Sequence, residues 1–108
     1  MEFSRVIAII RPEVINKVVE KLHSIEVPGI NTTQVKAYDD YVNYYTEDWM
    51  VTHTRVEVLV AEMDAEEVAE AIMSAAHTGL EGDGIVSISP VSALYHIRTK
   101  EKCSSKPC

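Results

Sequence analysis

One short segment, residues 78–84 (TGLEGDG), holds three of the four glycines in the chain. Glycine adopts positive φ angles and lets the backbone approach a ligand closely, and closely spaced glycines let successive N–H groups converge on an anion. The segment therefore fits a loop that binds phosphate. The same residues also fit a helix C-cap at Gly79 followed by a tight Gly-Asp-Gly turn, which is common local chemistry. Local spacing leaves both interpretations open.

The cysteines and histidines give weaker signals. Cys103 and Cys108 lie in a polar tail, where they either form a redox-sensitive clip that closes a short loop or remain two exposed thiols. Two cysteines do not complete a zinc site, which takes four ligands. The four histidines are not spaced as pairs of ligands, so we predict no metal site from them; they are His23, His53, His77 and His96.

An acidic, aromatic stretch covers residues 39–52 (DDYVNYYTEDWMVT) and shows no clean period. It is either a distorted hairpin or a protruding loop that contacts a partner, because Tyr and Trp contribute strongly to interfaces. The partner-contacting residues would be Tyr41, Tyr44, Tyr45 and Trp49. Its carboxylates could instead hold a hard cation; they are Asp39, Asp40, Glu47 and Asp48.

Length and charge narrow the class of protein. The chain has 108 residues, which suits one domain, and only 6% aromatic residues, so the core must be aliphatic. A net charge of −7 argues against nucleic acid as a partner. The sequence has no run of about eighteen apolar residues and its N-terminus does not resemble a signal peptide, so we expect a cytoplasmic protein.

Hydrophobic periodicity predicts the elements that position these residues. A nearly continuous apolar strand covers residues 3–10, and either both of its faces are buried or a partner seals one of them. Pro12 suits the first turn of a helix over 12–24. A capping-box pattern at Asp64 starts a second helix that ends at Thr78. Strands are predicted over 31–38, 55–61 and 85–88, with a short continuation over 93–97.

The resulting order, βαββαβ, predicts an α+β ferredoxin-like fold with four antiparallel strands and two helices on one face. The domain covers residues 1–99, and a flexible tail covers 100–108. The other face of the sheet is rich in Val and Ile and would be exposed in a monomer. A homo-oligomer that packs these faces inward covers it most simply.

Several motifs together resemble the PII nitrogen-regulatory signalling proteins. Residues 78–84 are similar to the family signature TGxxGDG(K), and residues 8–12 (AIIRP) to its opening AIIKP. Residues 28–36 (PGINTTQVK) are similar to GMTVTEVKG, residues 55–60 (RVEVLV) to KIEIVV, and residues 97–99 to IRT. The resemblance covers nearly the whole chain. It implies a ferredoxin-like homotrimer that binds adenine nucleotides in clefts between neighbouring subunits.

The resemblance also implies residue roles. Gly82, Asp83 and Gly84 would bind phosphate oxygens through backbone N–H groups, and Arg98 would supply a planar cation suited to phosphate. The adenosine pocket would be lined by Ile9, Gly29, Asn31, Ala37, Tyr38 and Leu59.

Two departures from the family change the expected ligand. Ile85 stands where the family has Lys after GDG, and His96 stands where the family has Arg. Each missing charge-assisted hydrogen bond is worth roughly 1.5–3 kcal/mol. We therefore expect ATP to lose its higher affinity, so that ADP or AMP binds as tightly as ATP or more tightly.

The 39–52 loop also differs from the family pattern, since it is shorter and lacks the YRGAEY modification motif. Tyr41 stands near the position where the family has a ligand-binding Gln. We expect neither 2-oxoglutarate sensing nor uridylylation. The pattern favours PII-like regulators linked to inorganic carbon. His53, His96 and Arg98 could then bind bicarbonate, although surface solvation is the more common role for each histidine.

The sequence thus predicts a non-enzymatic signal transducer in which nucleotide binding orders the 39–52 loop, and the loop docks on a membrane transporter or an enzyme. The alternative is a metal- or anion-binding accessory protein that needs no nucleotide. The sequence contains no recognisable catalytic triad or activated nucleophile, so we do not expect an enzyme.

Overall fold

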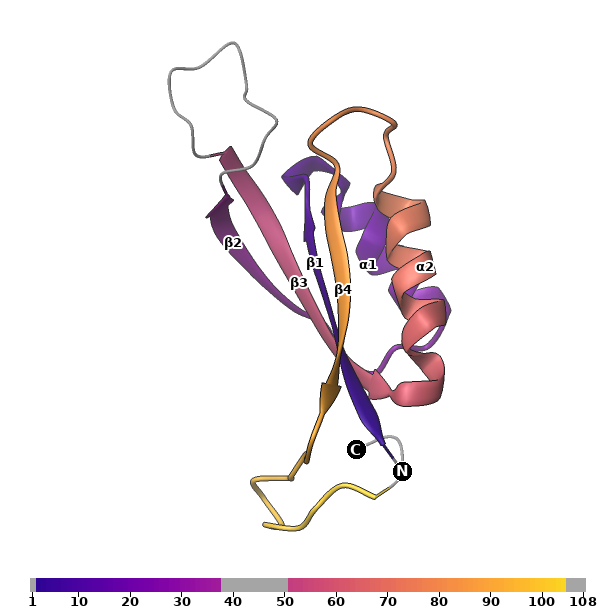
Figure 1. Cartoon of the computed structure of the whole chain (residues 1–108), viewed down its shortest axis with the longest axis vertical. Helices are drawn as coiled ribbons and strands as arrows, with labels where there is room; N and C mark the ends of the chain where they lie inside the picture. The colour runs from indigo at the N-terminus through magenta and orange to yellow at the C-terminus, as the bar shows by residue number, and fades with distance from the viewer. Residues whose placement is uncertain (1, 38–50, 105–108) are drawn as a thin grey trace.

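The computed structural model describes residues 2–37 and 51–104. Its centre is one antiparallel sheet built from β1 (Phe3–Ile10), β2 (Asn31–Ala37), β3 (Val51–Ala61) and β4 (Gly84–Val91). The strand order is β2-β3-β1-β4, so β1 and β3 are central. Both helices lie on the same face of the sheet (Figure 1). The predicted ferredoxin-like arrangement is confirmed.

Each helix follows a central strand through a short 3-10 turn. Pro12–Val14 leads into α1 (Ile15–Ser24), as the fixed φ of proline favours. Glu62–Asp64 leads into α2 (Ala65–Ala76), so Asp64 has helical backbone angles rather than the extended ones expected of a capping box.

The end predicted for the second helix is wrong by two residues. The helix stops at Ala76, and His77 is extended, with φ −63° and ψ 125°. Gly79 has the expected positive φ but is not the helix cap. The physical reason is that the Thr78 N–H and hydroxyl both donate to the Asp83 carboxylate, which draws the chain away from the helix axis.

The hydrophobic core lies between the helices and one face of the sheet. On β1 and β3 the buried residues alternate, so these strands are covered on one face only, and the interpretation of β1 as buried on both faces does not hold within one chain. The core side chains from the sheet and the two helices include Val6, Ala8, Ile10, Val56, Val58, Val60, Val18, Leu22, Val68 and Ile72.

Two strands are longer than predicted. Val51 and Thr52, which we assigned to the loop, pair with β2 as the first residues of β3. β4 extends from Gly84 to Val91 and includes Pro90. This proline is tolerated because β4 is an edge strand, where a missing N–H need not break the ladder.

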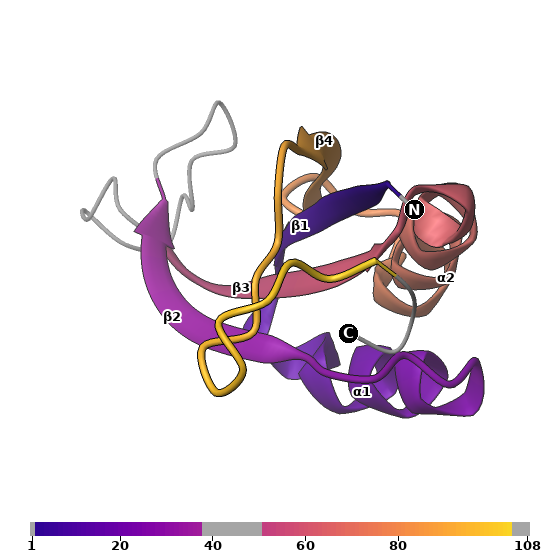
Figure 2. The ribbon, with the colours of Figure 1, turned by 90° about the horizontal axis from the view of Figure 1, so that it is seen from below.

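The chain after β4 folds back on itself (Figure 2). Tyr95 forms an isolated β-bridge with Lys102, and the Cys103 N–H donates to the Leu94 carbonyl at 2.7 Å. The predicted strand over 93–97 and the first residues of the predicted tail therefore form one small hairpin. Cys103 is buried and disulfide-bonded. The one other cysteine of the chain, Cys108, lies outside the described residues.

Gly84 has a conformation and surroundings that exclude any side chain. Its φ is +106°, and a Cβ atom there would lie 1.7 Å from the Ile9 carbonyl oxygen. We expect Gly84→Ala to destabilise the fold by at least about 3 kcal/mol, because backbone strain adds to a clash with β1. Chemical denaturation checks this. Gly29→Ala is the control, since a Cβ at Gly29 meets open space. Equal losses in the two variants would contradict the prediction.

Candidate functional site

The Asp83 side chain organises the loop between α2 and β4. One of its carboxylate oxygens accepts hydrogen bonds from the Thr78 N–H at 2.8 Å and the Gly79 N–H at 3.0 Å. The other oxygen accepts from the Thr78 hydroxyl and from Arg11 Nε, the latter at 3.0 Å. The loop is therefore folded around a carboxylate, and the chain itself uses the N–H groups at positions 78 and 79.

The same hydrogen bonds hold the pKa of Asp83 far below its ordinary range. The hydrogen bond from the Thr78 side chain contributes most, followed by the Thr78 N–H, while Arg11 and the Gly79 N–H contribute less and partial burial opposes them. Asp83 is thus ionised at any physiological pH, and its charge offsets that of Arg11.

Arg11 is a site residue that we did not identify from the sequence. It follows β1 directly and reaches the loop, where Nε contacts Asp83 and Nη2 donates to the Glu81 carbonyl. Gly82 has a positive φ, and a Cβ there would lie 3.3 Å from Arg11 Nη2. The available signal was the cation directly before Pro12, in the segment that resembles AIIKP.

A first group of predicted ligand residues lies at the Asp83 end of the sheet, and we call it the upper group. Ile9 pairs with Ile85 across β1 and β4, and Gly84 pairs with Ile10. Ala37 ends β2 near the same end of the sheet (Figure 1). The members of the upper group are Ile9, Ala37, Gly82, Asp83, Gly84 and Ile85.

A second group, the lower group, lies at the opposite end. A cavity of about 900 Å³ is lined there by Gly29, Asn31, Leu59 and His96. Its walls come from the turn before β2, from β3 and from the C-terminal hairpin, which also carries Arg98. The lower group comprises these four cavity residues and Arg98.

The two groups are well separated within one chain. Leu59 pairs with Arg5 on β1, whereas Gly84 pairs with Ile10, five residues further along the same strand. At about 3.3 Å per residue this amounts to about 17 Å. The predicted adenosine contacts and the predicted phosphate contacts are both divided between the two ends, so one chain does not gather either set.

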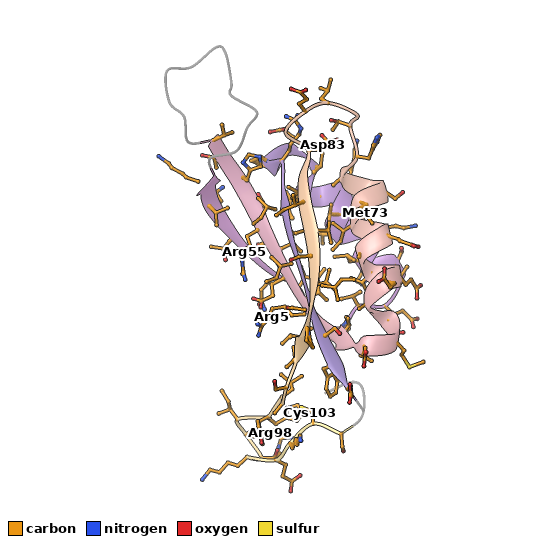
Figure 3. The ribbon with its side chains drawn as sticks, in the orientation of Figure 1. Arg5, Arg55, Met73, Asp83, Arg98 and Cys103 are labelled. Atoms are coloured by element: carbon orange, nitrogen blue, oxygen red, sulfur yellow. The ribbon has the colours of Figure 1, made fainter. Side chains whose placement is uncertain are left out.

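The three residues considered for an anion are not gathered within one chain either. His53 is buried in β3, with Nδ1 3.2 Å from the Val51 carbonyl oxygen, and it pairs with Val35. Arg98 lies in the hairpin beyond the other end of the sheet (Figure 3), and His96 belongs to the same hairpin, where its N–H donates to the Glu101 carbonyl.

Several predicted residues lie outside the part of the chain that the structure describes. They are the aromatic residues Tyr38, Tyr41, Tyr44, Tyr45 and Trp49, and the carboxylates Asp39, Asp40, Glu47 and Asp48. Among residues 2–37 and 51–104, no cluster of three or more His, Cys, Asp or Glu side chains is arranged for a metal ion. Within the same residues, no helix is long and apolar enough to cross a membrane.

The fold and the site define a ferredoxin-like domain with an ordered Gly-Asp-Gly loop at one end of its sheet and a ligand-sized cavity at the other. Residues 3–101 match the family model described as Nitrogen regulatory protein P-II. The chain is 34% identical to the P-II protein of Azospirillum brasilense, over 88% of this chain and 91% of that one. It is 36% identical to GlnK2 of Haloferax mediterranei, over 87% and 82%.

A solved structure agrees with these relatives. The crystal structure of Arabidopsis thaliana PII bound to citrate superposes with a TM-score of 0.79 at 31% identity, covering 94% of this chain and 85% of that one. The chain belongs to the PII nitrogen regulatory protein family. It is therefore a regulatory signal transducer and not an enzyme, as predicted, and proteins of this family are trimers that act on partner proteins.

The hydrogen bonds to the Asp83 carboxylate predict how the stability of the fold depends on pH. Because the pKa of Asp83 is lowered on folding, its stabilising contribution is complete above about pH 5 and declines as the pH falls further. We expect Asp83→Asn to be less stable than the wild type in urea at pH 7, and this difference to shrink at pH 3. A stability difference that does not change between pH 7 and pH 3 would contradict the stabilising role of the ionised Asp83 carboxylate.

Proposed function

We propose that the protein is a cytoplasmic PII-like homotrimer that binds an adenine nucleotide between neighbouring subunits, with ADP and AMP favoured over ATP and with bicarbonate as a second ligand. Nucleotide binding then regulates a membrane transporter or an enzyme, which the protein contacts through the segment 39–52. Family membership supports the regulatory role and the trimer.

One observation carries the proposal. The upper and lower groups lie at opposite ends of the same sheet, and each contains only part of the contacts for base and phosphate. A cleft between two subunits can combine the upper group of one with the lower group of the next. Such a head-to-tail contact repeats around a closed ring, which gives a trimer three equivalent clefts.

The charges of the loop favour nucleotides with few phosphates. Arg11 is the one cation recorded in contact with the described loop, and Asp83 neutralises it. With Glu81 included, Arg11 and the loop carry a net negative charge, and Ile85 adds no charge. Arg98 of the neighbouring subunit would then be the main cation for phosphate, so each further phosphate adds repulsion without a matching partner.

A mixing experiment tests whether the cleft lies between subunits. We expect Ile85→Glu in the upper group and Arg98→Glu in the lower group each to abolish nucleotide binding when present in every subunit. When both variants are co-expressed and assort at random into trimers, about one cleft in four over all trimers receives two intact halves. Calorimetry with ADP should therefore detect partial binding.

Mass measurement in solution is the control, because all three samples must be trimers and the co-expressed sample must contain both variants in one trimer. A site contained within one chain would show no recovery in the mixture, since every chain then carries one damaging substitution. Absence of recovery in verified mixed trimers would overturn the proposed cleft.

Restoring a cation tests the ligand preference. Ile85 is 68% exposed in the single chain and directly follows Gly84, so Ile85→Lys places an ammonium group beside the phosphate loop. We expect ATP affinity to rise about tenfold or more, because a charge-assisted hydrogen bond contributes roughly 1.5–3 kcal/mol, while AMP affinity changes little. Met63→Lys, which adds the same charge at an exposed distant site, is the matched control.

Calorimetry of the wild type with AMP, ADP and ATP, each with and without bicarbonate, tests the ligands themselves. We expect bicarbonate to strengthen nucleotide binding. ATP binding at least tenfold tighter than ADP and AMP would contradict the proposed order.

A further inference from the structure

The face of the sheet that the helices leave open carries an isolated group of charges. Residues paired directly across neighbouring strands point to the same face, and on this face Arg5 and Glu57 are neighbours of Leu59 and Ile7. Arg55 pairs with Ile9 on the same face. Figure 3 shows Arg5 and Arg55 on the side of the sheet away from Met73 of α2.

The geometry of these three side chains places one carboxylate between two guanidinium groups. Arg5 Nε lies 2.6 Å from Glu57 Oε1, and Arg55 Nη1 lies 3.3 Å from Glu57 Oε2. We call Arg5, Glu57 and Arg55 the arginine cluster. It has a net charge of +1, although the whole chain has a net charge of −7.

The arginine cluster has more hydrogen-bond donors than the recorded contacts use. Each guanidinium has five N–H donors, and within the described residues Glu57 is the carboxylate that contacts them. Arg5 Nε is buried and its close contact with Glu57 lacks hydrogen-bond geometry. Polar neighbours surround the cluster, since Ser89 pairs with Arg5, and Thr33 with Arg55.

The apolar residues around the cluster indicate what covers this face. Leu59, Ile7, Ile9 and Ile85 lie on it, and Ile85 is 68% exposed in the single chain. Packing of the three sheets against one another would bury these side chains together with the arginine cluster. Burying a net positive charge without a counter-charge is strongly unfavourable.

We propose that the arginine cluster binds a small oxyanion, of the phosphate, sulfate or bicarbonate type, when neighbouring subunits cover the open face. This inference rests on the trimer of the proposed function. A guanidinium fork matches two oxygens of such an anion, and the anion balances the surplus charge that assembly buries. The site uses three residues outside the predicted nucleotide contacts, and it couples anion binding to assembly.

The test is thermal unfolding of the trimer in sodium phosphate and in sodium chloride at equal ionic strength, with saturating ADP so that the nucleotide clefts are occupied. The wild type should gain several degrees as phosphate rises, with saturation, because the anion binds the assembled state. Arg55→Gln removes the surplus charge and should retain only the general salt effect. Glu57→Gln doubles the surplus and should respond more strongly.

Two further variants separate this site from its surroundings. Lys17→Gln removes an exposed charge from α1 and should respond as the wild type does. Arg98→Gln weakens the proposed nucleotide contact and, at an ADP concentration that still saturates this variant, should leave the phosphate response intact. Equal phosphate responses in the wild type, Arg55→Gln and Glu57→Gln, with ADP binding intact, would overturn the anion site alone. A wild type that neither binds ADP nor forms trimers would instead overturn the proposed function.

Discussion

The ion pair between Arg11 and Asp83 is the contact on which the described site depends. It joins the end of β1 to the loop that follows α2, and the two hydrogen bonds from Thr78 fix the same carboxylate from the helix side. Two segments distant in sequence, the end of β1 and the loop over residues 78–84, are thus held at one point. The close approach of Gly84 to the Ile9 carbonyl completes this end of the sheet, because no other residue fits there.

This constraint determines what the loop can offer a ligand. A guanidinium committed to Asp83 and to the Glu81 carbonyl organises the loop but leaves little positive charge for phosphate. Ile85 stands where the sequence resemblance implies Lys, so under the proposed function the cations for a nucleotide come from another subunit. The proposed function thus makes ligand binding depend on assembly.

Much of the fold followed from periodicity, because the alternation in β3 and the apolar stripe of each helix match the faces that the structure buries. The end of α2 was misplaced because the Asp83 carboxylate competes for Thr78, a contact that local propensity does not contain. Arg11 was missed as a site residue for a related reason, since its partner lies 72 residues away. The separation of the candidate site into an upper and a lower group could not be predicted either, because it depends on the register of the paired strands.

The most direct test of the shared cleft is the dependence of nucleotide binding on assembly. Native mass spectrometry of the protein with ADP, over a dilution series that partly dissociates the trimer, counts the nucleotides on each species separately. The cleft between subunits predicts up to three ADP molecules on trimers and none on monomers. Monomers that carry ADP as readily as the subunits of the trimer would contradict the account.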